Sequence, residues 1–277
     1  MELRNADGLT EQEFLARYNP KDYERPSVTV DMLVFGMDKS LNNLKLLLIK
    51  RKDHPFLGHW ALSGGFINPD ESAYQAACRE LEEETGLKDV YLEQFYIMTK
   101  PNRDPRMRVM SIDYLALVKT TEISAGDDAE EAIWFDISMT NDKLELYNKE
   151  NGLMSIYHLE RKEFSNGSIF RKEGYVAKHI VGFELAFDHV DSIIEGLLRL
   201  RNNLESSDVA FTLLDEEFTL PDLQHVYEVI LNKTYYKTNF KSSMLGKITP
   251  VAGKKGVSIT GGRSSQLYRY SRGLPCQ

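Results

Sequence analysis

The sequence contains little cysteine and no long apolar run. Its 277 residues include only two cysteines, Cys78 and Cys276, which argues against a disulfide framework and against a thiolate zinc site. No window approaches eighteen uninterrupted apolar residues, and the first residues lack the apolar segment of a signal peptide. We therefore expect neither export nor membrane spanning, and the predicted location is the cytoplasm.

Acidic side chains are absent from the last 49 residues. Residues 229–277 carry nine lysines and arginines and no aspartate or glutamate, whereas the preceding 228 residues carry 25 basic and 42 acidic side chains. The formal charge of −8 is therefore the sum of −17 over residues 1–228 and +9 over residues 229–277. An isolated basic segment in an acidic protein is typical of binding to nucleic acid or to another anionic surface. We expect the two parts of the chain to have different functions.

The first part has the composition of a globular domain. Apolar residues make up 42% of the chain, which is enough for a large core. A capping box at Thr10 predicts a short helix that ends before Asn19. Runs rich in Val, Leu and Ile predict strands at residues 27–35, 44–50, 90–98, 108–118 and 131–137.

A long amphipathic helix is expected to close this first domain. Between residues 184 and 204, Val, Ile and Leu recur at helical spacing. The polar region before it, residues 140–183, is interpreted as an insertion with a hairpin turn at residues 165–168. These boundaries place the first domain at residues 1–205.

Residues 206–277 have the order of elements that is typical of a winged helix. One helix is expected over residues 219–232. A shorter helix should begin near Thr238, with Phe240, Met244 and Leu245 facing the core. The predicted strands of the wing lie at residues 257–259 and 266–270, and its tight basic turn lies at residues 253–256.

A winged helix reads DNA with its second helix and contacts phosphate with its wing. The predicted DNA contacts are Lys237, Asn239, Lys241 and Ser242 in the helix, and Lys254, Lys255 and Arg263 in the wing. Double-stranded DNA is thus the expected partner of this domain, and no membrane is. Two-fold symmetric half-sites would suit a homodimer.

Acidic side chains gather in residues 65–87. If the centre of this segment is helical, Glu80, Glu83 and Glu84 stand at i, i+3 and i+4 and project from one face. Each like-charged pair destabilises the helix by roughly 0.2–0.5 kcal/mol. A hard divalent cation such as Mg²⁺ or Mn²⁺ relieves this crowding, because it takes oxygen ligands. The alternative interpretation is a solvated acidic face between two turn glycines.

The segment resembles the Nudix box, G-x5-E-x7-R-E-U-x-E-E-x-G-U with U aliphatic. Every defined position of the pattern is filled, by Gly65, Glu71, Arg79, Glu80, Leu81, Glu83, Glu84, Gly86 and Leu87. The resemblance implies an α+β chain in which a Nudix α/β/α sandwich with a mixed sheet precedes the winged helix-turn-helix domain. It also implies hydrolysis of a nucleoside diphosphate linked to another group.

The resemblance also implies a role for each catalytic residue of the box. Glu80, Glu83 and Glu84 match the metal-ligand positions, and Arg79 matches the arginine that holds these carboxylates. Glu71 matches the outer glutamate that supports Arg79; it could also cap the helix if the helix starts at residues 68–71. The implied cofactor, Mg²⁺ or Mn²⁺, would neutralise the pyrophosphate and lower the pKa of an attacking water.

Arginines and glycines outside the metal positions are candidates for substrate binding. Guanidinium groups suit bidentate contacts with phosphate oxygens, which favours Arg51, Arg103 and Arg106, although surface arginines often have no ligand. We expect Gly64 and Gly65 to lie beside the substrate as well.

Two further groups have open interpretations. Nudix enzymes often use an additional glutamate outside the box as a base, and Glu130 or Glu131 is the candidate, with a solvated lead-in to a strand as the alternative. Phe56 and Trp60 could stack on a base or pack in the core. No two histidines have metal-ligand spacing, so we expect structural or surface roles for them.

Three further runs narrow the resemblance. They are GHWALSGGF at 58–66, NRDPRMRV at 102–109 and FTLPDLQ at 218–224. With the basic tail they resemble ADP-ribose pyrophosphatases fused to a winged helix, known as Nudix-related transcriptional regulators of NAD metabolism. One departure is Ser63, where these proteins commonly have proline, and we expect it to affect loop stiffness more than chemistry.

Two functions remain compatible with the sequence. The first is a metal-dependent hydrolase that converts ADP-ribose to AMP and ribose 5-phosphate, which the complete box favours. The second is an ADP-ribose-sensing regulator of transcription with little or no hydrolysis, which the basic tail favours. Removal of non-standard nucleoside triphosphates is a third interpretation that the added domain does not support.

Overall fold

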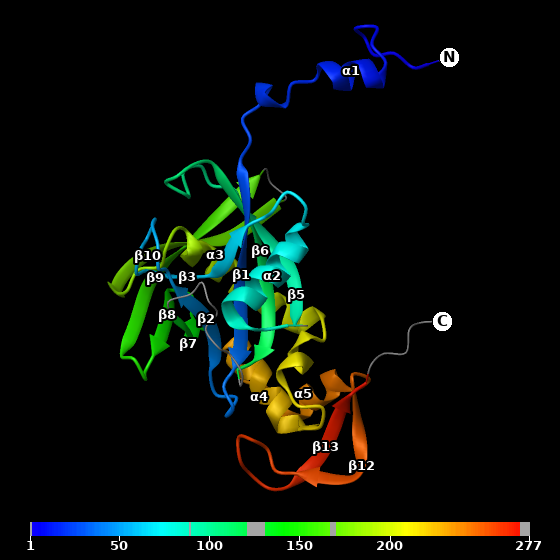
Figure 1. The fold of residues 1–277 in the computed structure, drawn as a ribbon. Helices are drawn as coiled ribbons and strands as arrows, with labels where there is room; N and C mark the ends of the chain where they lie inside the picture. Colours follow the sequence, from blue (N-terminus) through cyan, green and yellow to red (C-terminus); the bar gives the residue numbers. More distant parts are fainter. Residues whose placement is uncertain (1, 89, 121–130, 167–169, 272–277) are drawn as a thin grey trace.

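The computed structural model describes residues 2–88, 90–120, 131–166 and 170–271. Its first part contains α1 (Glu11–Arg17), the 3-10 helix η1 (Pro20–Asp22), β1 (Ser27–Met37), β2 (Leu44–Lys50), β3 (Trp60–Ala61), β4 (Ser63–Phe66), α2 (Ala73–Thr85), β5 (Tyr91–Met98), β6 (Val109–Lys119), β7 (Glu131–Met139), β8 (Lys143–Asn148), β9 (Leu153–Asn166), β10 (Phe170–Gly182) and α3 (His189–Ser206). The second contains η2 (Val209–Leu213), β11 (Phe218–Thr219), α4 (Leu220–Leu231), α5 (Lys237–Met244), β12 (Ile248–Gly256) and β13 (Ser265–Tyr270). Figure 1 shows α1 projecting from one end of the molecule and the β12–β13 ribbon at the other.

The strands of the first part form one mixed sheet. Among the described residues its order is β10-β9-β8-β7-β2-β1-β6-β5, with β3 paired to β2 and β4 paired to β1. β1 runs parallel to β6, and the other pairs are antiparallel. The predicted first helix and the five predicted strands are present with bounds within two residues of those expected. The α+β fold with a mixed sheet is therefore confirmed.

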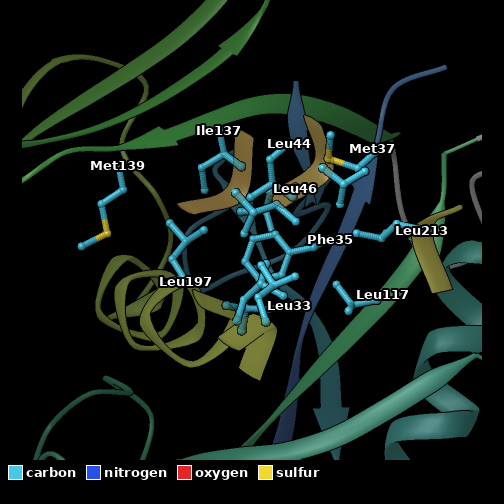
Figure 2. Packing of buried hydrophobic residues seen from close by; sticks show 14 of the residues in the cluster. Leu33, Phe35, Met37, Leu44, Leu46, Leu117, Ile137, Met139, Leu197 and Leu213 are labelled. Atoms are coloured by element: carbon cyan, nitrogen blue, oxygen red, sulfur yellow. The ribbon is translucent and has the colours of Figure 1, made fainter. Parts of the chain in front are cut away.

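Alternate side chains of β1 supply both cores of the sandwich. Val30 and Met32 are fully buried in a cluster with residues of α2. Leu33 and Phe35 are fully buried on the opposite side, in a cluster that includes Leu197 of α3, as Figure 2 shows. Successive strand residues point to opposite faces of a sheet, so this one strand fixes the positions of both covering helices.

The acidic segment forms α2, and its ends follow from capping chemistry. Ser72 Oγ accepts from the Gln75 N–H, and Gln75 Oε1 accepts from the Ser72 N–H at 2.8 Å, which is a capping box. Gly86, with φ of 72°, ends the helix. The interpretation of Glu71 as the helix cap is wrong, because Glu71 belongs to a turn in which its N–H donates to the Asn68 carbonyl.

The predicted start of the long helix at residue 184 is wrong. α3 begins at His189, because the residues before it are tied to β3. Leu185 forms a bridge with Trp60, and the Ala186 N–H donates to the Trp60 carbonyl at 2.9 Å. Phe187 has a φ of 52°, which no right-handed helix accommodates. Apolar spacing alone does not reveal this pairing.

Residues 140–183, interpreted as an insertion, contain β8, β9 and β10, which continue the sheet beyond β7. β9 and β10 pair as a long antiparallel hairpin, from Asn166 opposite Phe170 to Ser155 opposite Gly182. The predicted turn at 165–168 falls mostly outside the described residues. The assignment of this region as an insertion, and of residue 205 as the end of a domain, stay predictions.

The helices of the second part follow the expected order. α4 is capped by Thr219 and ends at Asn232, which has a φ of 51°. In α5, Phe240 and Met244 are buried as predicted. Leu245 is 69% exposed, so the prediction that it faces the core is wrong, because the helix ends one residue earlier.

The wing differs from its predicted form. β12 already includes residues 253–256, which were expected to form the basic turn, and Lys255 pairs with Gln266. The register shifts between Pro250 and Lys255, where Gly253 has a φ of 68°, so the glycine marks a bulge and not the turn. The predicted strand at 257–259 is therefore wrong, and those residues belong to the connection to β13. No helix of the described residues has the length and apolar character needed to cross a membrane.

Candidate active site and nucleic-acid surface

A cavity of about 190 Å³ lies beside β1, β4 and the start of α3. The residues predicted to bind substrate all line it: Arg51, Gly64, Gly65, Arg103 and Arg106. Larger hollows of about 730 and 840 Å³ lie between β5, β10 and α3 and beside η2. Neither is lined by a residue of the acidic segment, so we place the candidate site at the smaller cavity.

Arg79 links the carboxylates of the acidic segment. Its Nε and Nη2 donate to the two oxygens of Glu71 at 3.1 and 2.7 Å. Its Nη1 donates to Glu80 Oε1 at 2.8 Å and to Glu83 Oε2 at 3.1 Å. Hydrogen bonding to Glu71 is the largest cause of the raised pKa of Arg79, and the same bonds lower the pKa of Glu71 to about 2. The contacts are those that the expected holding role of Arg79 requires.

The glycine pair of β4 allows the strand to approach α2 closely. A Cβ on Gly65 would lie 2.1 Å from Glu80 Oε1, and one on Gly64 would lie 2.2 Å from the Val30 carbonyl oxygen. The Gly64 N–H donates to Glu84 Oε2 at 2.9 Å. A side chain at position 65 would therefore displace Glu80, and one at position 64 would displace the backbone of β1. The preceding Ser63 lies in β4 opposite Met32, so it is not in a loop whose stiffness it could affect, in contrast to the expectation.

Glu84 is a buried acid, with 7% of the residue exposed. Burial raises its pKa to about 8, and the charge of Glu80 adds to the effect, whereas the Gly64 N–H opposes it. Burial also raises the pKa of Glu80, although its hydrogen bond with Arg79 acts in the opposite direction. A cation between these two carboxylates would stabilise both ionised forms.

The predicted metal ligands are not gathered around one point in this structure. Among the described residues, no three Asp, Glu, His or Cys side chains converge as metal ligands do, because Glu83 turns toward Arg79. Glu80, Glu83 and Glu84 nevertheless share one helix face and offer the oxygens that Mg²⁺ and Mn²⁺ prefer. The Glu83 side chain is 50% exposed and accepts from Arg79 at 3.1 Å. The residues therefore fit a divalent cation that gathers them on binding.

We expect the variant Glu84→Gln to be more stable than the wild type at pH 8 in the absence of divalent cations. The folded-state pKa of Glu84 is raised from 4.5 to about 8, so its stabilising contribution is present below pH 4.5 and is lost as the pH rises through 8. The melting temperature of the variant should exceed that of the wild type by about 5 °C at pH 8. Calorimetry in a chelating buffer measures this.

The matched control is Glu82→Gln, because Glu82 is half-exposed and pairs with Lys88. Its melting temperature should equal that of the wild type at pH 4.5 and at pH 8. Equal melting temperatures of Glu84→Gln and wild type at pH 4.5 and pH 8 would contradict the buried charge at Glu84.

Arg51 and Arg106 reach the cavity from opposite loops and are oriented by aromatic rings. The guanidinium of Arg51 lies 5.0 Å from the ring centre of Phe187, and its Nε donates to the Pro55 carbonyl. The guanidinium of Arg106 lies 5.4 Å from the ring centre of Phe66. Cation–π contacts of this kind orient a guanidinium without neutralising it, which leaves Arg51 suited to an anionic ligand. Arg106 is also paired with the carboxylate of Asp104 at 2.7 Å, so an anionic ligand would compete with Asp104 for it.

Arg103 has a different environment, which the sequence did not reveal. Its side chain is 5% exposed and donates through Nη2 to Asp188 at 2.7 Å and to Asp31 at 3.3 Å. Asp31 stands in parallel register with Asp113, which is fully buried and whose pKa burial raises well above its usual value. A single carboxylate within each of two otherwise apolar strand sequences was a signal that could have identified Asp31 and Asp113.

His189 also lines the cavity, although we expected only structural or surface roles for the histidines. Its Nδ1 accepts from the Leu62 N–H at 2.9 Å, so the proton of the neutral ring lies on Nε2. Nε2 is 3.8 Å from Asp31 Oδ1. Burial lowers the pKa of His189, with Asp31 opposing the shift, so the ring is a neutral donor beside the cavity.

The remaining candidates lie away from the cavity. Glu131 begins β7 and lies 4.0 Å from Lys50, and Glu130 is outside the described residues. Trp60 packs at 5.2 Å on Phe135 in the core. Phe56 packs on the ring of Phe187 at 4.7 Å. Of the two interpretations for these aromatic rings, packing is the one that the structure supports.

The outer face of α5 forms a polar and basic surface. It consists of the exposed residues Lys237, Asn239, Lys241 and Ser242, which were predicted to approach DNA. The helix begins after Tyr236, which is 82% exposed. Since Phe240 and Met244 face the core, the polar residues of this helix face solvent together, as a recognition helix requires.

The basic residues of the wing do not have equal freedom. Lys255 and Arg263 are exposed. Lys254 pairs with Glu217 at 2.8 Å, and Arg269 pairs with the same carboxylate. A lysine already engaged by a carboxylate contributes less to binding phosphate, so we expect Lys255 and Arg263 to be the stronger phosphate contacts.

Comparison with protein families identifies both parts of the chain. Residues 25–154 match the NUDIX domain family. Residues 210–270 match the NrtR DNA-binding winged helix domain family. The matched ranges contain the acidic segment and the surface of α5, respectively.

Individual proteins resemble the chain over most or part of its length. It is 30% identical over 266 residues to the ADPR responsive transcriptional repressor NtrR of Acinetobacter baylyi, which covers 95% of this chain and 89% of that protein. It is 43% identical over 116 residues to an ADP-ribose pyrophosphatase of Methanocaldococcus jannaschii, over 42% of this chain and 65% of that protein. The crystal structure of Shewanella oneidensis NrtR complexed with a 27mer DNA superposes with a TM-score of 0.62 at 27% identity, over 88% of this chain and 93% of the other.

Proposed function

The chain belongs to the Nudix family, among the proteins that also carry an NrtR DNA-binding winged helix domain. From this premise we propose that it hydrolyses ADP-ribose and regulates the transcription of genes of NAD metabolism. The products are AMP and ribose 5-phosphate. The observation that carries the hydrolytic part is the complete set of box carboxylates held by Arg79 beside the cavity.

The residues of the candidate site have separate roles in hydrolysis. Glu80, Glu83 and Glu84 would hold Mg²⁺ or Mn²⁺, which supplies charge neutralisation and an activated water at the pyrophosphate. Arg79 positions Glu80 and Glu83, and Glu71 orients Arg79. The guanidinium groups of Arg51 and Arg106 bind the phosphate oxygens.

The regulatory part is supported by the winged helix. Its exposed helix α5 and basic wing carry the donors that DNA binding needs. The chain resembles a repressor named for its response to ADPR and a solved DNA complex. We propose that ADP-ribose is both substrate and effector, and that a homodimer binds two half-sites on DNA.

The test is a metal-dependent assay on the purified chain. With Mg²⁺ or Mn²⁺, ADP-ribose should yield AMP, and addition of EDTA should abolish the reaction, because it removes the cation that would neutralise the pyrophosphate and activate the water. Liquid chromatography quantifies AMP. If no AMP is released while ADP-ribose still binds by calorimetry, the protein is the non-hydrolysing sensor, and the hydrolytic proposal is wrong.

A further inference from the structure

The residue before α3 forms an ion pair with an arginine that lines the cavity. Asp188 directly precedes the helix, and its carboxylate accepts from Arg103 Nε at 3.0 and 3.1 Å and from Arg103 Nη2 at 2.7 Å. Arg103 lines the cavity. Both side chains are almost fully buried, 5% and 7% exposed, so the pair holds the first turn of α3 against the candidate site.

The same carboxylate has a second possible set of partners. Aspartate is among the preferred helix caps, because its oxygen accepts from the amides of the first turn. Asp188 occupies the cap position of α3 but makes no side-chain capping hydrogen bond, since Arg103 holds it. In this structure the Asp188 carboxylate is bound to Arg103, and the first-turn amides of α3 are a second set of partners that it does not use.

The far end of α3 contacts the winged helix. The helix spans His189–Ser206, which is about 27 Å at 1.5 Å per residue. Arg201 Nε donates to the Ile230 carbonyl at the end of α4 at 2.9 Å, and Glu205 pairs with Lys233 at 2.7 Å. Leu200 and Leu204 share one buried cluster with residues of α4. A change at Asp188 is thus transmitted by one rigid element to the DNA-binding part.

We propose that Asp188 is the switch that couples the nucleotide site to the winged helix. An anionic group of the ligand that enters the cavity competes with Asp188 for the guanidinium of Arg103. The released carboxylate caps α3, the first turn shifts, and the opposite end of the helix moves against α4. This inference rests on the proposed binding of ADP-ribose in the cavity.

The test compares DNA binding with and without ADP-ribose in the wild type and in Asp188→Ser. Serine caps a helix as aspartate does but cannot pair with Arg103, so the variant should remain in the released arrangement. Its DNA affinity without ADP-ribose should equal the ADP-ribose-saturated value of the wild type and should no longer respond. Fluorescence anisotropy measures the affinity for an operator-length duplex, with Ca²⁺ replacing Mg²⁺ to avoid hydrolysis.

A second readout separates coupling from a merely structural role. Coupling between two ligands is reciprocal and typically changes an affinity by a factor of about 5–150. Because the competing carboxylate is absent, Asp188→Ser should bind ADP-ribose more tightly than the wild type, by a factor within that range, as measured by calorimetry. A structural defect would weaken binding instead.

Variants at the far end of α3 complete the test. Arg201→Gln removes the contact with Ile230 and should reduce the response of DNA binding while ADP-ribose affinity stays within about twofold. The matched control is Arg199→Gln, because Arg199 pairs with Glu93 of β5 and not with the winged helix; its response should be that of the wild type. If Asp188→Ser does not fold, the response of DNA binding to ADP-ribose in Arg201→Gln compared with Arg199→Gln tests the proposal by itself.

Two outcomes overturn the coupling proposal. One is a full response of DNA binding in Asp188→Ser, or an equal response in Arg201→Gln and Arg199→Gln. The other is a wild type that binds ADP-ribose with no change in DNA affinity. Failure of the proposed function is distinguishable, since the wild type would then bind no ADP-ribose at all.

Discussion

Replacing Glu83 with glutamine is expected to lower kcat/KM for ADP-ribose by about a hundredfold or more, the magnitude of losing one group that stabilises the charge developing at a reacting centre. Glutamine has the shape of glutamate but lacks its charge, so it is a poorer ligand for a divalent cation. The Glu83 side chain is half-exposed and contacts Arg79, so the fold should be retained. The measurement is steady-state release of AMP with Mg²⁺.

The neighbouring residue provides a matched control for this variant. Glu82 is equally exposed, and its carboxylate pairs with Lys88 at 2.5 Å, away from Arg79. Glu82→Gln should retain kcat/KM within about twofold. Full activity of Glu83→Gln, or an equal loss in both variants, would refute the assignment of Glu83 as a metal ligand.

The double variant Lys255→Gln, Arg263→Gln is expected to weaken DNA binding and its dependence on salt. Each phosphate contact contributes about −0.9 to the slope of log K against log salt, so loss of two contacts should reduce the slope by about 1.8. The affinity should fall by roughly the same factor for every DNA sequence, because phosphate contacts carry no sequence information. Anisotropy titrations over a range of salt concentrations measure both quantities.

Lys254 supplies the control for the wing. Its ammonium group is already paired with Glu217 at 2.8 Å, so Lys254→Gln removes a cation whose charge is largely compensated. The slope for Lys254→Gln should change by less than half of one phosphate contact. An unchanged slope in the double variant would show that the wing does not contact DNA phosphates.

The sequence was most informative where local chemistry determines the structure. The capping box at Thr10 and the helix start at Thr219 were predicted, because each depends on side chains within a few residues. Strand bounds followed from runs of β-branched and apolar residues. Predictions failed where distant backbone groups compete, as at the start of α3, where β3 binds residues 185 and 186.

In the candidate site, too, contacts set by local spacing could be predicted and contacts between distant segments could not. The spacing of Arg79, Glu80 and Glu83 within one helix fixes their proximity, so their contacts could be predicted. The sequence grouped Arg103 with Arg51 and Arg106 as phosphate ligands. In the fold, Arg103 is enclosed by carboxylates from β1 and from the start of α3.

The sequence by itself determined that the chain has a box of carboxylates suited to a divalent cation and a separate basic part, because motif spacing and charge are properties of the chain. Only the tertiary structure decided that Asp31 and His189 line the same cavity as the glycine pair, and that Asp188 pairs with Arg103 of that cavity. These three residues lie up to 158 positions apart and meet because β1 packs beneath α3. Contacts between distant segments depend on how a sheet and its helices pack, which no local pattern encodes.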